Sequence, residues 1–168
     1  MDEPEWHRAN RANWDERVGI HTGPGGYDLS GLRAGCGRLN AIEEAELPPV
    51  RGRRVLHLQC HFGADSLTLA QRGAKVVGLD FSLPAIEVAR SLAGELGLTD
   101  QTSFFCADVY DAVQAIPLPH RFDTVFVTWG ALCWLPDITR WAQIVAAMLR
   151  AGRVLVPRRR PPRRLRAR

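Results

Sequence analysis

From Arg53 onward the chain alternates short apolar runs with amphipathic stretches, and this alternation limits the possible folds more than any other feature. The apolar runs lie at residues 55–58, 74–79, 102–106, 122–128 and 154–156, with helical patterns at 65–72, 82–96 and 138–149. Strands this apolar are covered on both faces, and strands separated by helices form parallel sheets with right-handed crossovers. The sequence therefore predicts a doubly wound α/β domain over residues 50–156.

The first 49 residues are predicted to form a cap of helices and loops over this domain. Four residues spaced by four share one face of a first helix: Trp6, Asn10, Trp14 and Val18. A Gly-rich stretch through Gly37 is expected to be an ordered loop. Residues 39–47 are expected to form a second short helix, ended by two prolines.

Composition indicates a soluble single domain. The chain has 168 residues, of which 46% are hydrophobic and 24% are charged. It contains no run of roughly 20 apolar residues for a membrane span, and its first residues are acidic, unlike a signal peptide. The four cysteines form no CxxC pair, which favours reduced thiols. We expect a cytoplasmic protein with no membrane partner.

The net charge of +4 is concentrated in the tail. Residues 150–168 carry nine basic and no acidic side chains, which leaves 13 basic against 18 acidic residues elsewhere. The body of the domain is therefore mildly acidic and offers no basic footprint for a polyanion, so we expect no nucleic-acid partner. The competing hypothesis is a nucleic-acid-binding protein that acts through the Arg-rich tail, although this tail lacks interleaved aromatic residues.

Three successive predicted strand ends carry residues suited to a nucleoside. In a doubly wound sheet, ligands bind beyond the carboxyl ends of the strands. Gly63 follows the first strand and allows close backbone approach. Asp80 ends the second strand, where a carboxylate can accept hydrogen bonds from both ribose hydroxyls. Asp108 follows the third and can accept a proton from an adenine amino group or cap a helix.

With these positions, residues 50–156 resemble the class I S-adenosylmethionine-dependent methyltransferases, which have a Rossmann-like fold. The matching motifs are VLHLQCHFG, VVGLDFS, FCADVYD, FDTVFVTWGALCWL and MLRAGRVLV. The resemblance implies S-adenosylmethionine as cofactor, with Gly63 beside its methionine part, Asp80 at the ribose and Asp108 at the adenine. The full set of cofactor-binding residues implied is His57, Gln59, Cys60, Gly63, Asp80, Phe81, Asp108, Val109 and Thr128.

The first motif departs from the usual D-x-G-x-G-x-G of that family. His57, Gln59 and His61 stand where the acid and the first two glycines are normally found. The HLQCHFG form resembles a bacterial subgroup of the family. A metal site at His57, Cys60 and His61 is not expected, because His57 and Cys60 point to opposite faces of a strand and no second cluster supplies a fourth ligand.

The resemblance implies methyl transfer to a small-molecule acceptor, in which the cofactor supplies the chemistry and the protein supplies alignment. No catalytic residue can be identified from the sequence. His21 is either a general base in a loop over the pocket or an ordinary surface histidine. Trp129 and Trp134 either wall the pocket or belong to the core. An NAD-dependent oxidoreductase is disfavoured because the G-x-G-x-x-G turn is absent.

The end of the chain differs from whole members of that family, which have two further strands. The chain contains 21 arginines and one lysine, Lys75, and Arg and Pro dominate residues 157–168. We interpret these residues as a basic, disordered tail that arose by truncation or frameshift. The final two strands would then be missing, activity would be impaired, and the fifth strand would be an exposed edge open to self-association.

Overall fold

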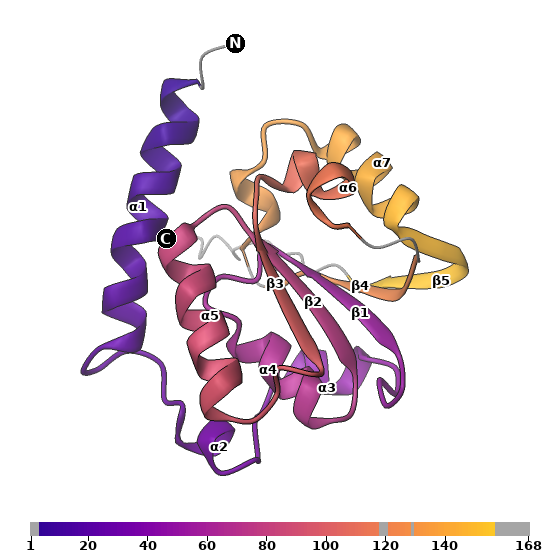
Figure 1. Ribbon diagram of the computed structural model, residues 1–168. Helices are drawn as coiled ribbons and strands as arrows, with labels where there is room; N and C mark the ends of the chain where they lie inside the picture. The colour runs from indigo at the N-terminus through magenta and orange to yellow at the C-terminus, as the bar shows by residue number, and fades with distance from the viewer. Residues whose placement is uncertain (1–3, 118–120, 129, 157–168) are drawn as a thin grey trace, which may run out of the picture.

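A five-stranded parallel sheet in the order β3-β2-β1-β4-β5 forms the centre of the protein in a computed structural model (Figure 1). The structure describes residues 4–117, 121–128 and 130–156. Strand order reverses between β1 and β4, which is the point where doubly wound sheets bind ligands. The predicted Rossmann-like fold is confirmed. Trp129 and the tail at 157–168, on which the nucleic-acid hypothesis depends, lie outside the described residues.

The elements follow the predicted alternation closely. The strands are β1 (Arg54–Leu58), β2 (Lys75–Asp80), β3 (Thr102–Cys106), β4 (Phe122–Phe126) and β5 (Leu149–Val156). The helices are α1 (Glu5–Thr22), α2 (Ser30–Arg33), α3 (Ala41–Glu46), α4 (Ala64–Gln71), α5 (Leu83–Glu95), α6 (Ala112–Ala115) and α7 (Ile138–Met148), with single turns η1 (Val109–Asp111) and η2 (Leu132–Trp134). None of the described helices is both long enough and apolar enough to cross a membrane.

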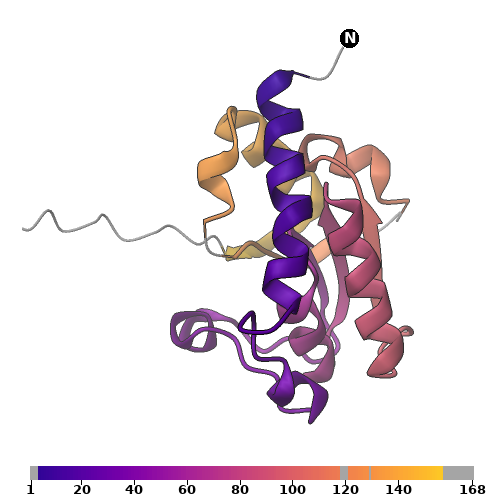
Figure 2. The same cartoon turned by 90° about the vertical axis from the view of Figure 1, so that its left-hand side faces the viewer.

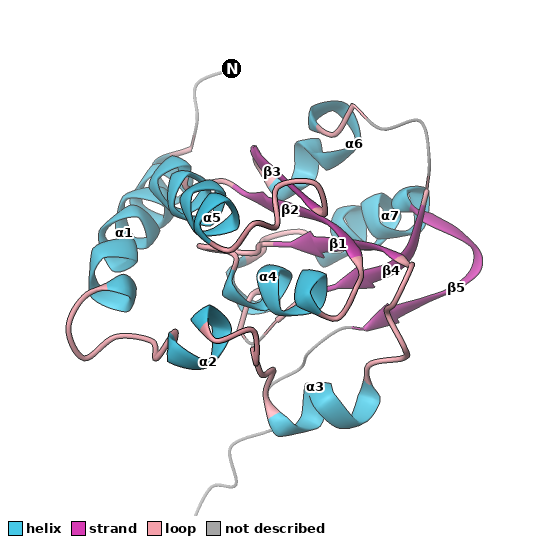
Figure 3. Ribbon diagram, turned by 60° about the horizontal axis from the view of Figure 1, so that its bottom comes forward, coloured by secondary structure: helices cyan, strands magenta, loops and turns pink. Residues whose placement is uncertain are grey.

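Two hydrophobic cores form on the two faces of the sheet because successive strand residues point to opposite sides. Val55 and Val76 belong to the core under α4 and α5, whereas Leu56 and Val77 belong to the core under α6 and α7. Figure 3 shows the sheet between these two layers. Burial on both faces is the physical reason that the strands are almost uniformly apolar.

Three expectations about local structure need correction. The Gly-rich stretch through Gly37 contains the short helix α2, where the Asp28 side chain accepts from the Ser30 N–H. The turns η1, α6 and η2 were not predicted, because segments of three or four residues show no periodicity. β5 starts at Leu149, five residues earlier than expected, with a register shift against β4.

The longest helix, α1, packs beside α5 at one side of the sheet (Figure 2). It extends the predicted helix at 6–18 by one residue at its start and four at its end, and only Val18 is buried. The other side chains of α1 that face the sheet are therefore not packed into the core, and some of them line the cavity described below. At the opposite edge, β5 pairs with β4 and with no other described strand, so self-association through this edge stays a prediction.

Candidate functional site

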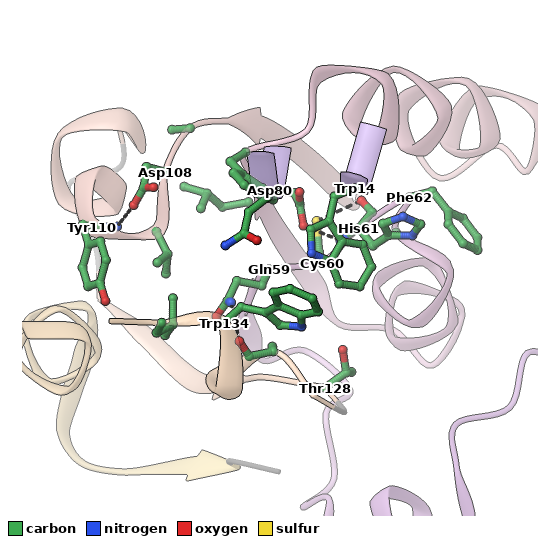
Figure 4. Close-up of a pocket in the computed structure, with 18 of the residues that line it drawn as sticks. Trp14, Gln59, Cys60, His61, Phe62, Asp80, Asp108, Tyr110, Thr128 and Trp134 are labelled. Carbon is green, nitrogen blue, oxygen red and sulfur yellow. Dashed lines mark hydrogen bonds between the residues drawn. The ribbon is translucent and has the colours of Figure 1, made fainter. Parts of the chain in front are cut away.

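A cavity of about 210 Å³ opens at the carboxyl ends of the strands. Its floor comes from the β1–α4 turn and from the ends of β2, β3 and β4, while α1 and η2 supply the remaining walls. Figure 4 shows Asp108 and Tyr110 at one end, Asp80 and Gln59 in the middle, and Trp14, His61 and Phe62 at the other end. The three strand ends singled out in the sequence therefore converge on one elongated pocket.

Eight of the nine candidate cofactor-binding residues line this cavity: Gln59, Cys60, Gly63, Asp80, Phe81, Asp108, Val109 and Thr128. His57 does not. Its ring is 1% exposed, and Nδ1 lies 2.8 Å from the Ser66 hydroxyl on α4. Burial lowers the pKa of His57 to about 3, so a neutral imidazole occupies the position where the family usually has an acid.

Two residues of the β1–α4 turn that are not glycine have a backbone conformation that glycine normally adopts. Gln59, His61 and Gly63 have φ values of 56°, 50° and 79°. These positions correspond to the three glycines of the usual family motif, and the left-handed conformation costs about 1–2 kcal/mol per non-glycine residue. Hydrogen bonds fix the turn, since the Cys60 N–H donates to the Leu79 carbonyl at 3.0 Å. The departure from the motif thus keeps a left-handed backbone at these positions and adds two side chains.

Gly63 is required by packing as well as by its conformation. A Cβ atom there would lie 2.9 Å from the Ala89 Cβ on α5 and 3.0 Å from the Phe104 ring on β3. Such distances force neighbours to move. Gly63 also lines the cavity, so the structural and functional explanations of this glycine hold together.

Asp80 is a buried carboxylate at the centre of the pocket, only 5% exposed. One oxygen accepts from the Ser82 N–H at 3.0 Å and the other from the His61 N–H at 2.8 Å. Burial raises the pKa of Asp80 to about 6; the backbone hydrogen bonds oppose this rise, and Asp15 adds to it. Asp80 therefore both ties β2 to the neighbouring turns and presents a carboxylate to the cavity.

Asp108 occupies the far end and is held by two partners. One oxygen accepts from the Tyr110 N–H at 2.7 Å, so the residue does cap the turn η1. The other lies 2.5 Å from Nε2 of His7 on α1. Side chains of this pair are 15% and 21% exposed. One oxygen of Asp108 therefore caps η1 and the other is bonded to α1, while the residue itself lines the cavity.

The contribution of α1 was largely missed by sequence reasoning. His7, Trp14 and His21 all line the cavity. They recur every seven residues, which is close to two helical turns and places them on one face. That spacing could have identified them. His21 lies at the end of this helix and not in a loop, and its ring centroid is 5.1 Å from that of His61. Trp134 lines the pocket while 41% exposed, so it is not a core residue.

The pocket has an acidic lining. The described residues around it include Asp65, Asp80 and Asp108 but no lysine or arginine. Burial raises the pKa of Asp65 to about 7, with Glu43 adding to the effect. Among the residues that the structure describes, no group of three or more His, Cys, Asp or Glu side chains is placed to hold a metal ion. The electrostatics favour a ligand that is neutral or positively charged.

Fold and site together define a Rossmann-like domain with a pocket at the carboxyl ends of its strands. The family model described as a methyltransferase domain matches residues 55–153, more than half of the chain. The chain belongs to this methyltransferase family. Its resemblance to the class I S-adenosylmethionine-dependent methyltransferases, inferred from the strand-end motifs, is confirmed.

Similar proteins differ in what they methylate. A 90-residue segment is 38% identical to the 23S rRNA (uracil(1939)-C(5))-methyltransferase RlmD of Shewanella amazonensis and covers 50% of this chain and 20% of that relative. A 106-residue segment is 32% identical to the ubiquinone biosynthesis O-methyltransferase of Paracidovorax citrulli, covering 63% and 43%. The chain spans less than half the length of either relative.

A solved structure shares the fold. The S-adenosylmethionine-dependent methyltransferase of Thiobacillus denitrificans, in complex with S-adenosylhomocysteine, superposes with a TM-score of 0.58 at 23% identity. The superposition covers 92% of this chain and 55% of that protein. It supports the arrangement of strands and helices described above.

Proposed function

We propose that this chain binds S-adenosylmethionine in the strand-end pocket and transfers its methyl group to a small-molecule acceptor. The observation that carries the proposal is the buried carboxylate of Asp80, which faces the pocket at the end of β2. A carboxylate at this place in a doubly wound fold accepts hydrogen bonds from ribose hydroxyls. Asp108 and Val109 at the end of β3 would border the adenine.

The residues present fit a cationic cofactor. A sulfonium ion is stabilised by the acidic lining, which contains no lysine or arginine among the described residues. The proposed binding set consists of Gln59, Cys60, Gly63, Asp80, Phe81, Asp108, Val109 and Thr128. Bound S-adenosylmethionine supplies an electrophilic methyl group; the protein holds the nucleoside, excludes water and aligns the acceptor.

The acidic lining also favours a small molecule over a nucleic acid as acceptor. Recognition of RNA or DNA depends on neutralising phosphates with lysine and arginine. The pocket offers none among the described lining residues, and the relatives that carry rRNA methyltransferase names are matched over a small part of their length. We therefore assign the acceptor to the small molecules.

Isothermal titration calorimetry with S-adenosylhomocysteine tests cofactor binding. The wild type is expected to bind, and Asp80→Asn, which removes the charge while keeping the shape, is expected to bind roughly 10- to 100-fold more weakly, since hydrogen bonds to charged groups contribute about 1.5–3 kcal/mol. Asp100→Asn, an exposed site outside this pocket, is the matched control. No heat with the wild type, or equal affinity in Asp80→Asn, would refute the proposal.

A further inference from the structure

An imidazole and aromatic cluster forms the end of the pocket away from Asp108. We define this aromatic cluster as six residues that line the cavity: Trp14, His21, Tyr27, His61, Phe62 and Trp134. Successive rings meet edge to face, with centroids 5.4 Å apart for Trp14 and His61, 5.1 Å for His21 and Tyr27, and 5.8 Å for Trp14 and Trp134. A further planar ring can pack on such rings in an offset-stacked or edge-to-face arrangement.

This cluster lies where an acceptor would have to enter. Asp108 and Asp80 mark one end and the middle of the pocket, and the proposed function assigns adenine and ribose to them (Figure 4). The methionine part of the cofactor, which the resemblance places beside Gly63, and the reactive methyl group then lie toward the remaining end, where Trp14, His61 and Phe62 lie. Tyr27 is 61% exposed and Trp134 is 41% exposed, so this end borders solvent and provides an entrance.

The two imidazoles are polar groups in an otherwise apolar wall. Nε2 of His61 and Nδ1 of His21 are covered by protein atoms and have no hydrogen-bond partner among the described residues. Burial lowers the pKa of His61 to about 4, with His21 contributing, and burial followed by Arg17 lowers the pKa of His21. Both rings are therefore neutral at pH 7 and able to accept a proton. His21 is the less buried of the two and can exchange that proton with solvent.

We infer, on the basis of the proposed function, that the aromatic cluster binds a planar, uncharged, hydroxyl-bearing aromatic acceptor and that His21 takes its proton during methyl transfer. The hydroxyl oxygen forms a bond to the methyl carbon, and the bond between that carbon and sulfur breaks with its electron pair left on sulfur. The hydroxyl proton moves to the His21 imidazole. A carboxylate or phosphate on the acceptor would meet Asp65 and Asp80 in a lining that contains no lysine or arginine; Arg17 lies 5.7 Å from the centroid of the Trp14 ring and is not among the lining residues.

The acceptor class is tested by binding 2-naphthol and 2-naphthoate to the full chain saturated with S-adenosylhomocysteine. These probes share a planar ring and differ in charge, so we expect 2-naphthoate to bind at least tenfold more weakly. Trp14→Leu is expected to weaken 2-naphthol binding about tenfold while S-adenosylhomocysteine affinity changes less than threefold. Ile20→Ala, on the same helix but exposed and outside the cavity lining, is the control and leaves 2-naphthol binding within threefold.

Four results of these binding measurements, with a uridine oligonucleotide as a third probe, are decisive. Equal or tighter binding of 2-naphthoate overturns the inference, as does tighter binding of a uridine oligonucleotide, which would indicate an RNA acceptor. Binding of S-adenosylhomocysteine without binding of 2-naphthol overturns this inference alone. Failure to bind S-adenosylhomocysteine overturns the proposed function itself.

The role of His21 is tested by the pH dependence of methyl transfer to 2-naphthol. The charged or titratable groups that act on His21 are Arg17 on its own helix, His61 on the β1–α4 turn and Tyr27 beside it. His21→Asn is expected to lower kcat about 100-fold at pH 7, within the usual range for a general base, and to recover as the acceptor ionises at alkaline pH. Because His21 belongs to the aromatic cluster, the affinity of this variant for 2-naphthol is measured separately, and the loss in kcat is expected to exceed any loss in affinity. An unchanged kcat at pH 7, or no transfer by the wild type, overturns this role.

Discussion

The two walls of the pocket are built in different ways. On the strand-end wall, backbone groups hold the residues in place. The Asp80 carboxylate accepts hydrogen bonds from N–H groups of two separate turns, and there is no room for a side chain at Gly63. On the α1 wall, hydrogen bonds to the strand ends run between side chains, as in His7 with Asp108 and Ser82 with Asp15. The first wall is therefore part of the fold, and we expect the second wall to be the less strongly held of the two.

The largest effect is expected from Gly63→Ala on the strand-end wall. Its new Cβ would meet Ala89 and Phe104 and would occupy a left-handed conformation. Overpacking costs about 1–3 kcal/mol and the conformation about 1–2 kcal/mol, so we expect a loss of about 3 kcal/mol in the free energy of unfolding, measured with urea.

Gly97→Ala separates these two causes. Gly97 has a φ of +66° with open space around its Cβ position, so only the conformational cost of about 1 kcal/mol applies. Equal losses for the two variants would show that packing against α5 and β3 does not constrain this wall.

The pH dependence of cofactor binding is expected to be the next largest effect. Burial raises the pKa of Asp80 from 3.8 to about 6, and ligand hydroxyls need the ionised carboxylate as acceptor. Affinity for S-adenosylhomocysteine should be nearly constant above pH 7 and fall about tenfold from pH 7 to pH 5, as the carboxyl takes up a proton. Calorimetry across this range measures the change.

Asp65 titrates in the same range because burial raises its pKa to about 7. Comparing Asp80→Asn with Asp65→Asn therefore assigns the effect. The loss of S-adenosylhomocysteine affinity at low pH should vanish in Asp80→Asn and persist in Asp65→Asn. The reverse pattern would mean that Asp65, and not Asp80, holds the ligand.

The smallest effect is expected from His7→Ala on the α1 wall. The pair with Asp108 is partly exposed, and such pairs contribute about 0–1 kcal/mol. We expect the free energy of unfolding to fall by less than about 1 kcal/mol and S-adenosylhomocysteine affinity to stay within threefold, by thermal unfolding and calorimetry. A loss as large as that of Gly63→Ala would mean that α1 is as integral to the pocket as the sheet.

The same contrast explains what the sequence could predict. Asp80 and Asp108 were identified because apolar periodicity locates strand ends, and the ends of parallel strands meet at one edge. The helix α1 was predicted as part of a cap over the domain, but the side chains that it turns toward the pocket were not, since local periodicity does not encode which face of a helix contacts its neighbours. His7 and Trp14 were therefore missed as lining residues.

The first motif shows a second limit. His57 was placed with the pocket residues, yet it belongs to β1 itself, where its side chain points toward Ser66 on α4. The first residue of this segment that lines the pocket is Gln59, two residues after His57. The left-handed backbone at Gln59 and His61 could not be foreseen from residue type, because that conformation is normally adopted by glycine.

A crystal structure of the full chain with S-adenosylhomocysteine tests the central claim most directly. The account predicts the ribose hydroxyls within roughly 3 Å of the Asp80 carboxylate and the adenine beside Asp108 and Val109. A ligand bound elsewhere, or one whose ribose makes no contact with Asp80, would contradict it.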